Sequence, residues 1–312
     1  SLNGLHVDLE RSTNMNYINK EKVNNRMGPR ATKNTVMKWV LFACTLVGMV
    51  VLAMLLFDVI SKGIKYLDSD FLMNFNDTSN PDNAGVKGAL IGSLWLMTTM
   101  APIAIILSVG TAIYMEEYAK DNLVTRFIDV NIANLAGVPS IVFGLLGLTI
   151  FVRGAGIEQL SLGVSVLAGA LTMALMLLPV IIVSSQESLR AVPNAIKEAS
   201  IGMGATKWQT ITNVILPAAI PGIVTGVILA LSRAVGETAP LVVIGVPVGM
   251  YFTPTNVMDT FSALPMQLFQ WVQLPKAEFQ NVTSSGIIIL LALLFIMNSA
   301  AIYIRNKYSK RY

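Results

Sequence analysis

The chain has 312 residues, of which 54% are hydrophobic and only 13% are charged, and its formal net charge is +4. Water-soluble domains carry about 25% charged residues, so this composition excludes an ordinary soluble domain. Basic residues interleaved with aromatic residues on one face are absent, and we therefore expect no nucleic-acid partner.

The first segment, residues 1–35, is a polar, basic and Asn-rich tail. Such a composition predicts poor order. Residues 1–14 precede Met15, and we interpret them as a remnant of cloning.

Six runs without Asp, Glu, Lys or Arg follow the tail. They are continuously apolar rather than alternating, which is typical of spanning helices and not of membrane β-strands. A helix needs roughly 20 apolar residues to cross about 30 Å of hydrocarbon. The sequence therefore predicts an all-α polytopic membrane protein with six transmembrane helices. The expected spans are residues 36–60, 88–114, 130–152, 160–184, 214–233 and 284–304.

The distribution of Lys and Arg predicts the orientation of these helices, because cytoplasmic loops are enriched in both residues. With the N-terminus in the cytoplasm, sixteen of the 22 basic residues lie inside and five lie outside. Both termini, the basic tail 305–312 and the loop 187–217 are then cytoplasmic. The loop 61–87 is then external.

Residues 238–283 admit two interpretations. Residues 238–258 are charge-free and long enough for a seventh span, but Pro240, Pro247 and Pro254 argue against a continuous helix. A seventh span would also move the basic C-terminal tail outside, so we favour an external or re-entrant loop. Within it, residues 261–271 are either an amphipathic piece at the membrane interface or a segment packed on the helix bundle.

Arg233 and Glu237 are ionisable residues within the expected fifth helix. A charge at bilayer depth costs about 2.5–3.5 kcal/mol, so it needs a polar cavity or a partner. Their i,i+4 spacing places them on one helix face, where they can pair. Either the pair only fixes helix packing, or Arg233 lowers the barrier for an anion while Glu237 holds its geometry.

Small, polar and helix-breaking residues gather in the expected third span. They are Asn131, Asn134, Gly137, Pro139, Ser140 and Gly144. One interpretation is a broken helix whose second half, capped by Ser140, presents free N–H groups and a positive dipole to an anion. The other is that small residues permit close helix packing. The sequence leaves both open.

The absence of two motifs limits the chemistry of the chain. No Gly-Lys dipeptide occurs, so a Walker A phosphate loop is excluded and we expect no ATP hydrolysis by that route. No group of His, Cys and carboxylate residues has the spacing of a metal site. We therefore expect no catalytic residue, no metal and no cofactor bound by this chain.

The polar segment 198–217 contains Glu198-Ala199-Ser200, Gly204 and Leu216-Pro217. This spacing resembles the EAA loop of ATP-binding-cassette (ABC) importer permeases, with Ser200 and Val214 departing from the usual Ala and Ile. The resemblance implies short coupling helices that press into a groove on a cytoplasmic ATPase. The implied coupling residues are Glu198, Ala199, Ser200, Gly204, Leu216 and Pro217.

Two other stretches resemble the permeases of bacterial phosphate importers. Residues 131–145 resemble a hallmark of that family, and residues 233–241, RAVGETAPL, resemble its PstA-type subunits. The match covers about residues 88–304 and implies a type I ABC importer domain in the bacterial plasma membrane. It also implies roles for Arg233 and Glu237 in phosphate passage, and we add Asn134 and Ser140 as expected pathway residues.

The same resemblance implies the partners of the chain. They are a PstC-like permease subunit, two copies of a PstB-like ATPase that uses ATP and Mg, and an external PstS-like phosphate-binding protein. The sequence thus predicts the non-catalytic permease subunit of an ATP-driven phosphate importer. A permease for sulfate or molybdate remains open, because one Arg does not distinguish tetrahedral anions. An ion-coupled secondary transporter would predict an internal repeat, and we find none. A non-transporting membrane anchor is a third alternative.

Overall fold

The computed structural model describes residues 20–308, so the expected remnant 1–14 lies outside the described residues. The chain divides into two units, residues 1–58 and 59–312. The described part of the first unit is helical, and its helix α2 (Lys20–Gly63) continues into the second unit. Residues 20–35, predicted as poorly ordered, are therefore helical. Extending the apolar span backwards costs little, because propagation needs no new helix nucleus.

The second unit contains helices and irregular loops, and no strand lies among residues 20–308. The elements η3, η4 and η7 are single π-helical turns, and the other η elements are 3₁₀ turns. In chain order the elements are η1 (Ile64–Tyr66), α3 (Ser69–Met73), η2 (Pro81–Asn83), α4 (Lys87–Ile113), η3 (Tyr114–Tyr118), α5 (Leu123–Leu135), α6 (Ser140–Gly147), η4 (Leu148–Val152), η5 (Gly154–Gly156), η6 (Glu158–Leu160), α7 (Val166–Arg190), α8 (Asn194–Gly202), α9 (Lys207–Thr210), η7 (Ile211–Ile215), α10 (Leu216–Val235), α11 (Ala239–Val243), α12 (Leu264–Val272) and α13 (Glu278–Tyr308).

Among residues 20–308, five helical stretches are long and apolar enough to cross a membrane. They are Ala31–Tyr66, Lys87–Tyr118, Val166–Arg190, Lys207–Val235 and Glu278–Lys307. The sixth candidate span is a pair of helical segments, Leu123–Leu135 and Ser140–Val152, bent by 107°. The predicted all-α class is confirmed. The basic tail predicted from residue 305 starts inside α13, which continues to Tyr308.

The third span, predicted over 130–152, is broken, as one of the two interpretations of its helix-breaking residues held. The helix stops at Leu135 and restarts at Ser140. Pro139 has no backbone N–H to donate and disfavours helical geometry at Val138 before it, so the break falls at this position. The first half also begins earlier than predicted, at Leu123, where the Asn122 side chain accepts a hydrogen bond from the Thr125 N–H, at 2.8 Å.

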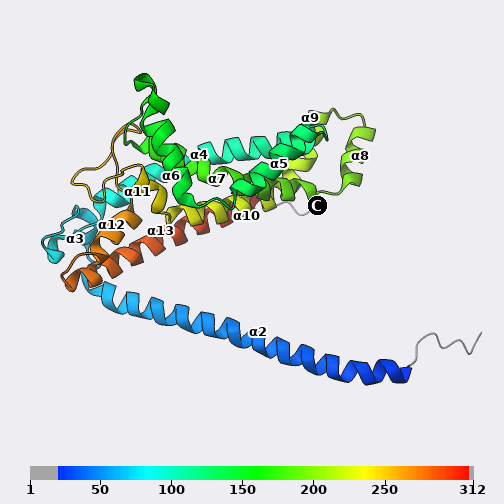
Figure 1. Ribbon diagram of the computed structural model, residues 1–312, viewed down its shortest axis with the longest axis horizontal. Helices are drawn as coiled ribbons and strands as arrows, with labels where there is room; N and C mark the ends of the chain where they lie inside the picture. The colour runs from blue at the N-terminus through cyan, green and yellow to red at the C-terminus, as the bar shows by residue number, and fades with distance from the viewer. Residues whose placement is uncertain (1–19, 309–312) are drawn as a thin grey trace, which may run out of the picture. The chain divides into compact units, whose positions relative to one another are not determined.

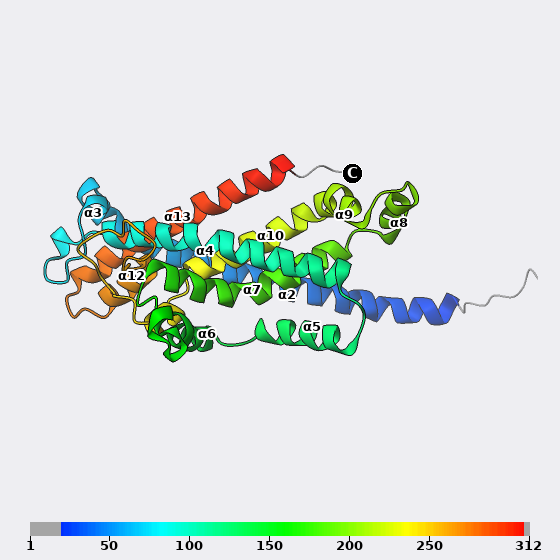
Figure 2. The same ribbon diagram turned by 90° about the horizontal axis from the view of Figure 1, so that it is seen from above.

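Helix α7 forms the centre of the second unit, with α4 and α10 packed along it (Figure 1). Met173, Leu177 and Ile181 of α7 are almost completely buried. The α8 and α9 helices lie at one end of the bundle, and α3 and α12 lie at the other (Figure 2). The loop predicted to be cytoplasmic and the loops predicted to be external therefore lie at opposite ends.

Two glycines of α10 let it approach α7 closely. A Cβ atom at Gly222 would lie 2.5 Å from the Ser188 Oγ, and one at Gly226 would lie 2.2 Å from the Ser184 Oγ. These separations are shorter than real Cβ contacts, so a side chain at either position would force the facing serine or one of the helices to shift. Small residues at i and i+4 are the usual means of close helix packing in membranes.

No helix long enough to span a membrane lies within residues 238–277, which excludes the seventh span. Its helix α12 packs on α13 and α4, with Leu264, Leu268 and Trp271 buried. The Trp271 indole N–H donates to the Asn76 Oδ1, at 2.8 Å. The segment 261–271 is therefore packed on the bundle, as one of the two interpretations held.

The loop before α12 also closes the N-terminus of α7. The backbone N–H groups of Val166 and Leu167 donate to the carbonyl oxygens of Asp259 and Val257, at 3.0 and 2.8 Å. The Asp259 carboxylate accepts hydrogen bonds from the backbone N–H and the hydroxyl of Thr255, and from the N–H of Asn256. These bonds lower the pKa of Asp259. The first N–H groups of α7 are thus already bonded within the chain.

We expect Gly226→Ala to destabilise the α7–α10 packing by about 1–3 kcal/mol, because the added methyl group overpacks the contact with Ser184. The matched control is Gly110→Ala on α4, where a Cβ meets nothing within 4 Å. There the change only improves helix propensity, by up to about 1 kcal/mol. Thermal unfolding of the purified complex should show a lower midpoint for Gly226→Ala alone. Equal midpoints for both variants would contradict the close approach of α10 to α7.

Candidate functional site

Arg233 and Ser140 line the same small pocket in the membrane-embedded part of the bundle. The two halves of the broken third span form one wall of this pocket, and α7 and α10 form the rest. The other lining residues are Leu135, Ala136, Val138, Phe143, Met176, Leu177, Val180 and Ala230. The enclosed space is about 20 Å³, which is enough for about one water molecule. This pocket therefore does not have room for a tetrahedral anion.

Arg233 is paired with Glu237, with the Arg233 Nε 3.3 Å from the Glu237 Oε1. The sequence placed both on one helix, but α10 ends at Val235 and Glu237 lies beyond its C-cap, Gly236. The pair thus joins the last turn of α10 to the bend before α11. The Arg233 side chain is 65% exposed and that of Glu237 only 22%, so the guanidinium has an open side.

The other two predicted pathway residues are placed differently. Ser140 is the first residue of α6, and Pro139 occupies the N-cap without a side-chain hydrogen bond. The prediction that Ser140 caps the break is therefore wrong. Asn134 lies in the last turn of α5, is exposed, and is not among the residues that line the pocket. The structure places Arg233 with Ser140 in this pocket and pairs Arg233 with Glu237, which lines a different pocket, and Asn134 lines neither.

Both interpretations of the third span hold in part. The helix is broken, and Gly144 of α6 also packs closely on α11, where a Cβ would lie 2.9 Å from the Pro240 Cα. Because Pro240 follows Glu237 by three residues, this contact fixes the bend that carries Glu237 against the broken span.

The segment 187–217 forms a helical hairpin at one end of the bundle. Helix α8 leads through a tight turn at Gly204, whose φ is +90°, into α9. The Thr206 side chain and the Gln209 side chain form a capping box that starts α9. Glu198, Ala199 and Gly204 are exposed on this hairpin, whereas Leu216 and Pro217 are half-buried at the start of α10.

Ser200, where the EAA pattern usually has Ala, has a structural role. Its hydroxyl lies 3.0 Å from the Thr210 hydroxyl, so it joins the last part of α8 to the last residue of α9. The Ser200 carbonyl also accepts the Ala205 N–H across the turn, at 3.2 Å. The departure from the pattern thus adds a hydrogen bond within the hairpin.

An apolar surface surrounds the exposed turn. Its members are Ile196, Ile201, Met203 and Trp208, and Met203 is 88% exposed. Large apolar side chains clustered on a polar loop are typical of an interaction surface.

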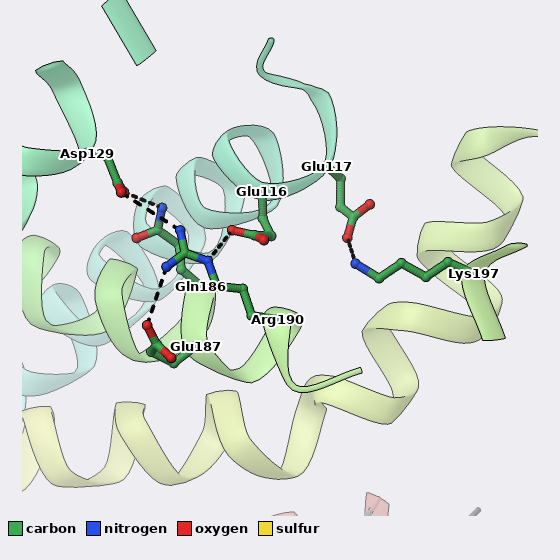
Figure 3. A network of polar contacts seen from close by, with 7 residues as sticks. All are labelled: Glu116, Glu117, Asp129, Gln186, Glu187, Arg190 and Lys197. Atoms are coloured by element: carbon green, nitrogen blue, oxygen red, sulfur yellow. Dashed lines mark hydrogen bonds and ion pairs between the residues drawn. The ribbon is translucent and has the colours of Figure 1, made fainter. Parts of the chain in front are cut away.

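Charged residues that the sequence did not single out converge at the base of the hairpin (Figure 3). The Arg190 Nε lies 2.8 Å from the Glu116 Oε2, and the Lys197 Nζ lies 2.6 Å from the Glu117 Oε1. The signal in the sequence is an acidic pair directly after an apolar span. It is too common to stand out without knowing which basic residues face it.

Comparisons with known proteins place this arrangement in a family. Residues 109–310 match the family described as the inner membrane component of binding-protein-dependent transport systems. The chain belongs to this family of ABC importer permease subunits. The match covers the bent third span, the hairpin and the Arg233–Glu237 pair, and it makes the chain a multi-pass component of the bacterial inner membrane.

Individual members of the permease family resemble the chain over most of its length. A probable ABC transporter permease of Bacillus subtilis, YqgI, is 33% identical over 74% of this chain and 76% of its own. The phosphate transport system permease protein PstA of Yersinia pestis is 31% identical over 87% of this chain and 90% of its own.

A solved bacterial alginate ABC transporter shares the fold. Its matching chain has a TM-score of 0.60 and 13% identity, over 90% of this chain and 99% of that one. This likeness supports the permease fold and says nothing of the substrate. The relatives are permease subunits rather than ATPases, in keeping with the missing Walker A motif.

We expect Gly204→Ala to destabilise the hairpin, because an alanine at φ +90° is strained by about 1–3 kcal/mol. No atom lies within 4 Å of the added Cβ, so any effect comes from the backbone and not from crowding. Hydrogen exchange of residues 194–210 should become faster in this variant. Gly202→Ala, also without neighbours within 4 Å, is the control and should leave the exchange unchanged.

Proposed function

We propose that the chain is the PstA-like permease subunit of an ATP-driven importer of inorganic phosphate. The observation that carries this proposal is the open side of Arg233 on a membrane-spanning helix. A guanidinium facing lipid is costly, by about 2.5–3.5 kcal/mol even on the mildest scales. The exposed side of Arg233 therefore faces a water-filled path or the partner permease subunit.

Phosphate suits such a path chemically. A guanidinium offers a planar pair of donors that match two phosphate oxygens, and Glu237 holds its other edge. Ser140 and the N-terminus of α6 add donors on the facing wall. Because the pocket of this chain is small, the second half of the path comes from a PstC-like subunit. Asn134 is exposed on the same broken span and is proposed as a contact on the way to the pocket.

The α8–α9 hairpin is proposed to face the cytoplasm, together with both termini, and to dock on one of two PstB-like ATPases. These use ATP and Mg, whereas this chain binds neither. Glu198, Ala199 and Gly204 belong to the docking turn, Ser200 stabilises it, and Leu216 and Pro217 connect it to α10. At the opposite end, the loops over 61–87 and 238–283 are proposed to receive phosphate from a PstS-like binding protein.

A permease for sulfate or molybdate is the rival function, because its substrate would meet the same Arg233. The complex in lipid vesicles, with its ATPase and binding protein, separates the two. Phosphate should stimulate ATP hydrolysis and enter the vesicles, and sulfate should do neither. Stimulation by sulfate or molybdate alone would reject the phosphate assignment.

We expect Arg233→Gln to lower phosphate import by about 10–100-fold, since hydrogen bonds to a charged group contribute about 1.5–3 kcal/mol. Arg233→Lys should be intermediate, because it keeps the charge and loses the planar pair of donors. Arg126→Gln, an exposed arginine near the base of the hairpin, is the control and should import normally. Normal import by Arg233→Gln, at normal expression, would leave a structural ion pair or a mere membrane anchor as the better explanation.

We expect Met203→Glu to weaken binding of the ATPase by about 10–100-fold, because burial of a methionine side chain contributes about 1.5–3 kcal/mol. Co-purification of the ATPase with the tagged permease measures this. Met258→Glu, at the other end of the bundle and 50% exposed, is the matched control. If both variants retained the ATPase, the apolar turn would not be its docking surface.

A further inference from the structure

The π-helical turn η3, at the end of α4, is contacted by the helix that enters the hairpin and by both of its short helices. At its centre, Arg190 of α7 pairs with Glu116 and Lys197 of α8 pairs with Glu117 (Figure 3). The two acidic residues are neighbours in the sequence, and 74 and 80 residues separate them from their partners. These pairs therefore join parts of the chain that meet only in the folded bundle.

The next residue of the turn completes the set. The Lys207 Nζ, at the start of α9, lies 5.1 Å from the centre of the Tyr118 ring, within the range of a cation–π contact. Consecutive side chains of a helical turn point in different directions, so the three cations approach it from different sides. The turn itself closes through the Ala119 N–H, which donates to the Tyr114 carbonyl at 2.8 Å. Such π turns are frequent at functional sites.

Burial distinguishes the Lys197–Glu117 pair from an ordinary surface ion pair. Its side chains are only 18% and 10% exposed, and its atoms are 2.6 Å apart. The nearby Arg126–Asp121 pair is 72% and 89% exposed and 3.8 Å apart. Exposed pairs of that kind contribute little, whereas removing one partner of a shielded pair leaves a charge without compensation.

The contacts continue from the turn to the broken span. Arg190 also reaches the Asp129 carboxylate of α5, at 3.8 Å, and the Gln186 amide donates to the same carboxylate, at 2.9 Å. Helix α5 then leads to the break and to Ala136 in the wall of the Arg233 pocket. A displacement of η3 therefore has a continuous route to this wall.

We propose that η3 is a second mechanical connection through which movement of the α8–α9 hairpin reaches α4 and α5, in addition to the direct continuation into α7 and α10. Glu117 and Lys197 are its positioning residues. The inference rests on the proposed function, in which an ATPase moves the hairpin. It adds that α8 displaces the end of α4 because the shielded ion pair holds them together.

A reporter in the pocket wall tests this connection without reference to the substrate. In this chain, Cys44→Ser removes the one cysteine and Ala136→Cys introduces a thiol in the wall, and the complex is assembled with partner subunits whose accessible cysteines are replaced. The rate of maleimide labelling is measured with and without ATP and vanadate. We expect the nucleotide-dependent change in this rate to fall at least about fivefold in Glu117→Gln and in Lys197→Met, while the ATPase still co-purifies. A fivefold fall corresponds to about 1 kcal/mol of lost coupling.

Exchange of the two charges provides the rescue. The double variant Glu117→Lys with Lys197→Glu should restore at least half of the nucleotide response, because the response depends on the pair and not on either side chain alone. Asp121→Asn and Arg126→Gln break the exposed pair at the same end and should leave the response unchanged. In vesicles, the single variants should also hydrolyse more ATP for each phosphate imported.

Three outcomes would overturn the connection: an unchanged response in both single variants, loss of the ATPase from them, or no rescue by the exchanged pair. Failure of the unmodified complex to import phosphate is a separate result. It would reject the proposed substrate, while the labelling response to nucleotide would still decide the role of Glu117 and Lys197.

Discussion

The close approach of α7 and α10 determines how the rest of the bundle is arranged. Helices in lipid gain little from the hydrophobic effect, so contact between small residues carries their association. Gly222 and Gly226 bring α10 against Ser188 and Ser184, in the half of α7 that leads to the hairpin. Both ends of the hairpin are thereby held together, and α8 and α9 project as a short, closed unit instead of a loose loop.

The break in the third span places irregular backbone beside Arg233. A continuous helix over 130–152 would bury its backbone groups in intrahelical hydrogen bonds and place an apolar face beside Arg233. The bend at Ala136–Pro139 instead gives the Arg233 pocket a wall that contains Ala136, Ser140 and the start of α6. Irregular backbone is tolerated at this depth where it is covered by protein or lines a cavity. In this chain Ala136, Gly137 and Pro139 are exposed, and Gly144 packs on Pro240 further along α6.

Charge is distributed unevenly between the two ends of the bundle. The hairpin end carries the shielded Lys197–Glu117 pair and the more exposed Arg190–Glu116 pair. The other end is held by contacts such as the Trp271 indole with Asn76, the Gln267 amide with the Gly85 carbonyl and the Lys276 ammonium with the Ser79 carbonyl. Loss of one partner of a shielded ion pair leaves an uncompensated charge, which is more costly than the loss of a neutral contact. Ion pairs of this kind at the hairpin end are suited to transmit movement from a partner ATPase to the helices.

The sequence by itself determined the membrane class, the number of spans and the position of the hairpin, because these follow from local composition, charge-free length and a spacing of motif residues. It also indicated Arg233 and Glu237 as candidate pathway residues, because a charged side chain within an apolar run needs a polar cavity or a partner. It did not determine that α10 ends between them, that Pro139 breaks a span while Pro102 lies within the continuous α4, or that Ser140 is not a cap. Nor did it pair Glu117 with Lys197 among the many charges of the cytoplasmic segments. These features depend on contacts between residues far apart in the chain, and only the packing of the folded helices decides which of the locally allowed geometries forms.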